Sequence, residues 1–252
     1  MRLRSLALMA AAVGVAVTAS ARLVAQQPAV QASSVTVVQV RPEAVDAWRD
    51  FQAKQTVPAL KKAGITQRDV WESIYGPAGQ YRIVQPIVKY ADRDNPQGPV
   101  ARALGEAAAR TYNEALRKMQ ASAVTTTITS IADVSYNPNP TAIYPVLVLT
   151  RYHVAPGRAA DFRAYLDERA AAVKKGQPKR DLVSRVAFGG DNNEFRIASF
   201  ESNFAALDGE SALQRGAGAE GVAKLTAKMI GVVLSTDRTV WRHVEALSFA
   251  SK

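Results

Sequence analysis

The sequence predicts an α+β protein made of two similar halves, each with the element order strand, helix, strand, strand, helix, strand (βαββαβ). The first observation behind this prediction is a repeated landmark. Pro42 and Pro156 lie 114 residues apart, and each is followed six residues later by an aromatic residue, Trp48 and Phe162. In both places a β-branched run comes before the proline, which indicates a strand that leads into a helix.

A second landmark returns at the same offset. Tyr81-Arg82-Ile83 reappears as Phe195-Arg196-Ile197, again 114 residues later. Two landmarks at one offset, in the same order and with matched chemistry, indicate a tandem repeat rather than chance similarity.

The first residues have the pattern of a secretory signal peptide, assigned here to residues 1–21. A short basic start precedes an apolar run, and Ala19-Ser20-Ala21 has the form that signal peptidase cleaves. Cleavage after Ala25 and a retained membrane anchor are the alternatives. The run is short for a spanning helix, and no later stretch is long and apolar enough to span. We therefore expect a periplasmic or secreted protein with no stable membrane insertion after cleavage, beginning with a disordered segment, residues 22–34.

Composition excludes several classes of function. The chain has no cysteine, which rules out disulfides, thiolate nucleophiles and thiolate metal sites. Its formal charge is +10, but lysine and arginine are spread along both halves without a dense basic run. We therefore expect no nucleic-acid partner. The charge instead favours solubility and attraction of small anionic molecules.

The first unit is assigned to residues 35–136. Pro58 is expected to interrupt its first helix, and Gly64 to end it. An apolar stripe of Leu104, Ala108, Ala115 and Met119 is expected on the second helix, which Pro99 opens. The predicted strands are residues 35–40, 70–75, 81–88 and 124–134.

A linker, residues 137–145, separates the halves, because Asn137-Pro138-Asn139-Pro140 suits neither a helix nor a central strand. The second unit is assigned to residues 146–250. Its predicted strands are residues 146–154, 182–188, 194–200 and 239–249. Its predicted helices are residues 158–174 and 222–230, with a short helical piece near 204–213.

A βαββαβ unit places both helices on one face of an antiparallel sheet, so the other face needs a cover. We expect the two units to cover each other, sheet to sheet. The residues Val154, Pro156, Gly157 and Phe162, with Val40, Pro42 and Trp48 as a weaker copy, resemble the dimeric α+β barrel (ferredoxin-like) superfamily. That superfamily includes antibiotic-biosynthesis monooxygenases, NIPSNAP and EthD-type proteins and some haem enzymes. The resemblance implies an intrachain α+β barrel and leaves the activity open.

Alternation along residues 146–154 selects candidate site residues. Val148, Tyr152 and Val154 are expected to face the helices, while Leu147, Leu149, Arg151 and His153 are expected to face the barrel interior. The corresponding first-half positions are Val35, Val37 and Gln39. The sequence thus predicts an asymmetric interior that is more polar in its second half.

Trp241 and His243 share a face of the last strand and complete the predicted ligand-binding set of Arg151, His153, Trp241 and His243. His153 is the one candidate catalytic base, because imidazole transfers protons near neutral pH. The alternative interpretation gives these residues ordinary structural roles, as core aromatics, hydrogen-bonded histidines and ion-paired arginines.

Neither a metal nor a cofactor is predicted. Gly216-Ala217-Gly218-Ala219-Glu220-Gly221 fits G-x-G-x-x-G, but it lacks the preceding strand of a dinucleotide site. His153, His243 and Glu245 could share a metal only if their strands were adjacent in a matching register. Haem-binding members of the resembled superfamily offer a histidine from a helix, and no predicted helix contains one.

Three functions stay open at this stage. The first is an exported protein that binds a small anionic or aromatic molecule in the barrel interior. The second is a cofactor-independent enzyme similar to the small monooxygenases. The third is a structural module that self-associates through helices or sheet edges.

Overall fold

The structure is a computed structural model that describes residues 32–250. The predicted signal peptide, residues 1–21, lies outside the described residues. The first strand begins at Ala32, three residues before the expected start of the first unit. Ser33 and Ser34 are therefore part of a sheet rather than of a disordered segment, because both pair with strands on either side.

The first half contains four strands, β1 (Ala32–Val40), β2 (Gln67–Tyr75), β3 (Gln80–Ile87) and β4 (Gln120–Ser130). Its first helical segment is nearly continuous and consists of η1 (Pro42–Ala44), α1 (Val45–Phe51), a π-helical turn η2 (Gln52–Thr56) and α2 (Val57–Lys62). Its second helical region consists of η3 (Tyr90–Arg93), α3 (Pro99–Leu104), α4 (Glu106–Met119) and, after β4, η4 (Ala132–Val134).

The second half repeats this order with β5 (Val146–Val154), α5 (Ala159–Lys175), β6 (Arg180–Phe188), β7 (Glu194–Glu201), η5 (Phe204–Leu207), α6 (Ala212–Ala227) and β8 (Val233–His243). A turn η6 (Glu245–Leu247) and a short strand β9 (Phe249–Ala250) follow.

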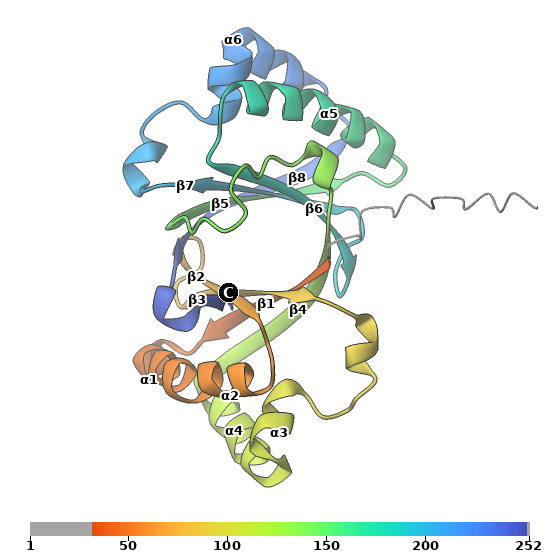
Figure 1. The fold of residues 1–252 in the computed structure, drawn as a ribbon. Coiled ribbons are helices and arrows are strands. Elements are labelled where there is room, and N and C mark those ends of the chain that lie inside the picture. The colour runs from red at the N-terminus through yellow and green to blue at the C-terminus, as the bar shows by residue number, and fades with distance from the viewer. Residues whose placement is uncertain (1–31, 251–252) are drawn as a thin grey trace, which may run out of the picture.

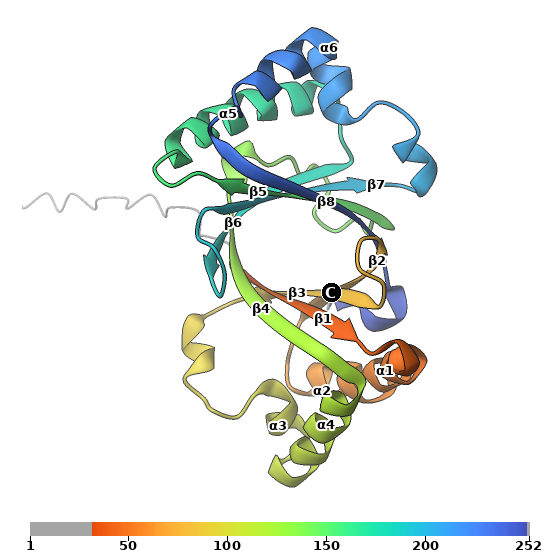
Figure 2. The ribbon, with the colours of Figure 1, turned by 180° about the vertical axis from the view of Figure 1, so that it is seen from behind.

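The eight main strands form one closed antiparallel barrel (Figures 1 and 2). The first half has the strand order β2-β3-β1-β4 and the second has β6-β7-β5-β8. Pairing of β4 with β6 and of β2 with β8 joins the halves on both sides. The expectation of two sheets stacked face to face is corrected in this respect. Closing the barrel satisfies the backbone groups that two separate sheets would leave free at four edges.

Strand register agrees with the sequence repeat. Val37 pairs with Arg82 in the first half, and Arg151 pairs with Arg196 in the second. Both pairs are related by the offset of 114 residues. Two residues further along the same strands, Gln39 pairs with Gln80, and His153 pairs with Glu194.

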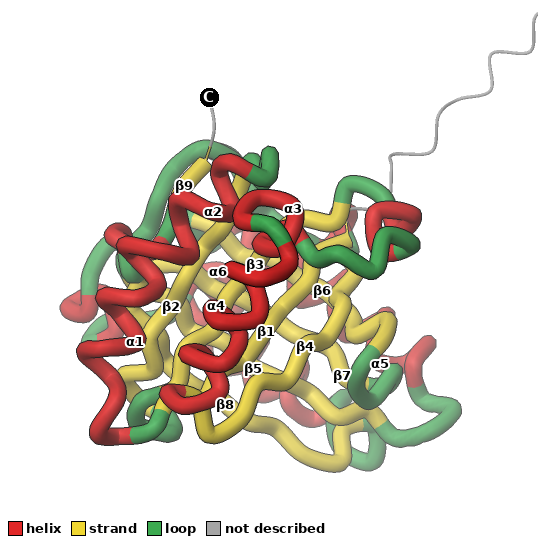
Figure 3. The backbone as a smooth tube through the Cα atoms, turned by 90° about the horizontal axis from the view of Figure 1, so that it is seen from below, coloured by secondary structure: helices red, strands yellow, loops and turns green. Residues whose placement is uncertain are grey.

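The helices cover the outside of the barrel in two layers, with α1 to α4 over the first half and α5 and α6 over the second (Figures 1 and 3). Trp48 and Phe162 are both 0% exposed and anchor the two helix-to-sheet cores. Their expected equivalence is confirmed. Each core takes the alternate residues of its strands, such as Val38 and Val40 or Val154, and leaves the other set to the barrel interior.

Several local expectations differ from the structure, including the last helix, which is Ala212–Ala227 rather than residues 222–230. The second helix of the first half is broken at Gly105, which has a φ of +83°. The phase of α4 therefore shifts, and Ala109 and Tyr112 are buried in place of the expected Leu104 and Ala108. The strand before η4 ends at Ser130 rather than at residue 134. The last long strand is Val233–His243 rather than residues 239–249, because a turn follows it.

The glycines of the G-x-G-x-x-G segment serve helix packing. Gly218 has a φ of +68° and kinks α6. Gly216 lies against α5 so closely that a Cβ built on it would be 1.8 Å from the carbonyl oxygen of Ala172. Gly176 makes the reciprocal contact with Ala212. This close approach explains the glycines without any nucleotide.

We therefore expect Gly216→Ala to lower the free energy of unfolding by at least about 1–3 kcal/mol, because α5 and α6 must move apart. Urea denaturation followed by circular dichroism measures this change. Gly209→Ala is the matched control, since nothing lies within 4 Å of a Cβ at that position. Equal stabilities of the two variants would show that α5 and α6 are not in close contact.

Candidate functional site

The barrel interior is packed at one end and open to solvent toward the other. Leu147 and Leu149 are each 2% exposed, whereas the side chains of Arg151 and His153 are 37% and 34% exposed. The closed end holds an aromatic plug, defined here as Trp71, Tyr144, Leu147, Leu149, Phe200 and Trp241. The four expected inward positions of β5 thus form a gradient from apolar to polar.

Two arginines of this interior are paired with carboxylates. Arg151 forms an ion pair with Asp237, its cross-strand partner on β8. Arg196 donates from Nε to Glu194 Oε1 at 2.5 Å and from Nη1 to Thr126 Oγ1 at 3.1 Å. Arg196 and Glu194 are both buried, so this second pair is shielded from solvent.

A third arginine, Arg82, has no such partner. It is 5% exposed, and its Nε is buried without a hydrogen-bond partner. Among residues 32–250, no hydrogen bond or ion pair joins its guanidinium to another side chain. The pKa of Arg82 is lowered from 12.5 to about 9, mainly by burial and also by the guanidiniums of Arg196 and Arg151, while Glu194 acts in the opposite direction.

The position of Arg82 follows from strand alternation. Tyr81 and Ile83 pack in the helix-side core, so Arg82 between them faces the inside of the barrel. Its cross-strand neighbour on β2 is Trp71, which belongs to the aromatic plug. Arg82 therefore lies between the plug and the charged region.

The structure does not bring the four sequence-predicted site residues together. Arg151 pairs with Asp237, four residues from Trp241 on β8, which is about 13 Å along an extended strand. His153 pairs with Ser235, eight residues from His243, or about 26 Å. Arg151 and His153 thus belong to the open end, and the other two residues belong to the closed end.

Trp241 and His243 are buried in structural surroundings. Trp241 donates from Nε1 to Thr239 Oγ1 at 2.8 Å. His243 packs edge-on against Trp71, and its Nε2 lies 3.9 Å from Asp69 Oδ1 without a hydrogen bond. Burial lowers the pKa of His243 below its ordinary 6.5, although Asp69 and Glu245 act in the opposite direction. Burial therefore favours the neutral form of His243.

His153 lies at the rim between two carboxylates. Its Nδ1 is 3.4 Å from Asp191 Oδ2, and its Nε2 is 3.8 Å from Glu194 Oε2. The imidazole is one-third exposed and lies on the same face of β5 as Arg151. This position allows proton exchange with solvent, and the predicted role as a base remains a prediction.

A metal or haem site is not supported by the residues present. Within residues 32–250, no group of three or more potential metal ligands converges. Both histidines of the chain lie on strands, so no helix offers the histidine that the resemblance associates with haem. In the same part of the chain, no helix is long and apolar enough to cross a membrane.

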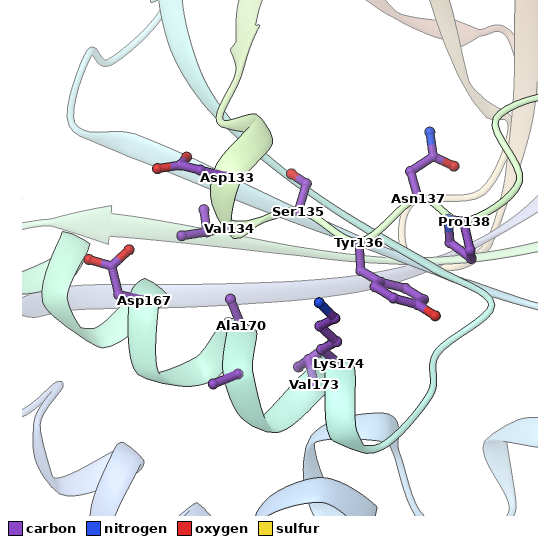
Figure 4. A pocket seen from close by; sticks show the side chains of 11 residues that line it. Asp133, Val134, Ser135, Tyr136, Asn137, Pro138, Asp167, Ala170, Val173 and Lys174 are labelled. Carbon is purple, nitrogen blue, oxygen red and sulfur yellow. The ribbon is translucent and has the colours of Figure 1, made fainter.

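Two surface pockets lie outside the barrel. One, of about 450 Å³, runs between α5 and the segment from η4 to Pro138, and its lining includes Asp167, Val173 and Lys174 on one side and Asp133, Tyr136 and Pro138 on the other (Figure 4). The other, of about 550 Å³, is lined by Thr129, Ile131, Ala159, Arg163, Arg185, Val186, Ala187, Asn192 and Phe195. Neither pocket contains any of the sequence-predicted site residues.

Comparison with known proteins identifies the fold. No family model and no curated protein matches the sequence. A candidate monooxygenase from Fusobacterium nucleatum aligns with 90% of this chain and 100% of its own, at 10% identity and a TM-score of 0.58. A candidate monooxygenase from Lactobacillus acidophilus aligns with 88% of this chain and 96% of its own, at 9% identity and a TM-score of 0.56. An anthrone oxidase-like protein aligns with 85% of this chain and 92% of its own, at 10% identity and a TM-score of 0.58.

The chain has the dimeric α+β barrel fold. At these identities the likeness concerns the fold alone. In this chain both halves of the α+β barrel come from one polypeptide, so the interior is lined by two different sets of side chains.

Sequence reasoning missed Arg82 as a functional candidate. The signal for Arg82 was present, because it is the central residue of the repeated Tyr81-Arg82-Ile83 landmark. Strand alternation alone predicts that the Arg82 side chain faces the barrel interior, as it does for Arg151. Its missing partner was not predictable, since that depends on which carboxylates the closed α+β barrel brings near.

Proposed function

We propose that this protein binds a small anionic or aromatic molecule in the barrel interior, at the level of Arg82. The observation that carries the proposal is a buried guanidinium without a partner. A buried, unpaired charge costs several kcal/mol, and groups with strongly perturbed pKa values cluster at functional sites. The solvent-exposed side chains of Arg151 and His153 mark the end from which a ligand would enter.

The wider proposal includes export and a repeated architecture. We infer that the halves are tandem copies of one ferredoxin-like unit, supported by strand order and by the shared register of Val37–Arg82 and Arg151–Arg196. The N-terminal sequence pattern supports a periplasmic or secreted location. We also propose that the protein is related to antibiotic-biosynthesis monooxygenase, NIPSNAP or EthD-type proteins.

Removal of the unpaired charge is expected to stabilise the ligand-free protein. Arg82→Met should raise the free energy of unfolding by roughly 1–3 kcal/mol at pH 7, because an apolar side chain replaces an uncompensated cation. The folded-state pKa lies below the ordinary value, so the charge penalty in the wild type fades above about pH 9. The advantage of the variant should shrink in that range. Urea denaturation at pH 7 and pH 10 measures both effects.

Arg196→Met is the matched control, because it stands at the equivalent position of the repeat. This change leaves Glu194 buried without its cation and should lower stability by about 3–5 kcal/mol. Opposite signs for the two variants are the expected result. Destabilisation by both would mean that Arg82 already has a stabilising partner, and the proposed site would lose its basis.

An enzyme is the second candidate, and the position of His153 favours it. An imidazole beside two carboxylates, at the rim and on the same face as Arg151, could take a proton from a phenolic substrate. Two candidate monooxygenases share this fold. Oxygen consumption on addition of an electron-rich phenol, lost in His153→Ala, would distinguish an enzyme from a binding protein. Absence of any consumption leaves the binding function.

A further inference from the structure

The charges of the interior limit which anion it can accept. The open half holds three guanidiniums, on Arg82, Arg151 and Arg196, and three carboxylates, on Asp191, Asp237 and Glu194, with His153 between Asp191 and Glu194. Arg151 and Arg196 each form an ion pair with a carboxylate, whereas the Nε of Arg82 has no hydrogen-bond partner within the described part of the chain. A ligand with a single negative charge would pair with Arg82, whereas a dianion would add a second negative charge beside fixed carboxylates.

The shape of the unpaired group narrows the choice further. A guanidinium presents its N–H donors as a planar fork, which matches the two oxygens of a carboxylate. The Nε of Arg82 is buried and unpartnered, so the donor edge that takes part in such a fork is unused.

The aromatic plug defines where the rest of the ligand would lie. Trp71 is the cross-strand neighbour of Arg82, and it contacts Phe200 edge-to-face with ring centroids 5.6 Å apart. Toward the open end the interior is charged instead. An apolar body attached to the carboxylate would therefore pack toward Trp71 and be excluded from the charged region.

We propose that the ligand is a monocarboxylate with an apolar, preferably aromatic, body, whose carboxylate is held by Arg82 and whose body lies on the Trp71 side. This inference rests on the proposed binding function and specifies the class of ligand. Phosphate, sulfate and dicarboxylates are rejected by Asp237 and Glu194.

Binding of benzoate by the full chain tests the proposal, with acetate, sulfate and phosphate at matched ionic strength as comparison anions. Benzoate is expected to raise the Tm of the wild type. Its dissociation constant, measured by calorimetry, should increase about tenfold or more in Arg82→Met, because a charge-assisted hydrogen bond is lost. Arg185→Met is the control, since Arg185 lies over the Phe195 ring on the helix side, and it should bind benzoate as the wild type does.

A direct readout guards against variants that fold poorly. In ¹⁵N NMR spectra, the Nε–Hε signal of Arg82 is the one that is missing from Arg82→Met. Benzoate should shift this signal in the wild type, and sulfate should leave its position unchanged. An Arg82-dependent response to sulfate or phosphate at least as strong as that to benzoate would overturn the monocarboxylate assignment but keep the proposed function. Benzoate binding that is independent of Arg82, or no response to any anion, would remove both.

Discussion

Replacing Trp48 or Phe162 by alanine is expected to lower the free energy of unfolding by about 3–5 kcal/mol in each case. Both side chains are 0% exposed. Trp48 packs on Tyr81 with ring centroids 4.4 Å apart, and Phe162 packs on Phe195 at 4.9 Å. The Nε1 of Trp48 has no hydrogen-bond partner, so the loss comes from packing and from the cavity left behind.

Urea denaturation followed by tryptophan fluorescence and circular dichroism measures this loss. Because β4–β6 and β2–β8 connect the halves by hydrogen bonds, we expect each variant to lower one common transition rather than that of its own half. Tyr75→Ala is the control, since Tyr75 is 66% exposed and should cost less than about 1 kcal/mol. Losses below about 1 kcal/mol for both core variants would contradict their placement in the two cores.

The second large effect concerns a buried ion pair of the second half. Arg169 donates from both terminal nitrogens to Asp181, at 2.7 and 3.0 Å, and Ser199 donates to the same carboxylate at 2.6 Å. The two side chains are 8% and 3% exposed. Asp181→Ala should lower the free energy of unfolding by about 3–5 kcal/mol, because it leaves the guanidinium buried and uncompensated.

A double-mutant cycle separates loss of the pair from loss of either residue. Replacing both members, as Arg169→Met with Asp181→Leu, should recover much of the stability that the single change removes. Equilibrium urea denaturation of the two single variants and the double variant gives the coupling free energy. Additive losses, with no recovery in the double variant, would show that the two side chains do not interact as the structure indicates.

Local sequence rules were sufficient for most of the fold. The apolar residue two positions before Pro42 and Pro156, and the aromatic residue six positions after each, placed both first helices correctly, because these patterns depend on the chain near them. The stripe through Leu104 and Ala108 was wrong because one glycine at a positive φ reset the helix phase. Barrel closure was not predictable from one half, since edge pairing depends on how far each sheet twists when both are present.

The candidate site shows the same division. Strand alternation predicted that Arg151 and His153 face the barrel interior. It does not predict how far along the strands Trp241 and His243 lie from them. That separation is set by the β5–β8 register. Arg82 became a candidate only when the structure showed which arginines had carboxylate partners.

Among residues 32–250, Arg196 has an ion-pair partner and Arg82 has none, and this difference bears on how many ligands one molecule could bind. Two identical copies of one half would meet about a two-fold axis, and every interior charge would then occur twice. Here Glu194 lies two residues before Arg196 on β7. The equivalent residue, two positions before Arg82 on β3, is the neutral Gln80. At these two equivalent positions, the single chain therefore has one buried guanidinium with a paired carboxylate and one without. The proposed site at Arg82 would occur once per molecule, away from the axis, and its ligand would take a single orientation.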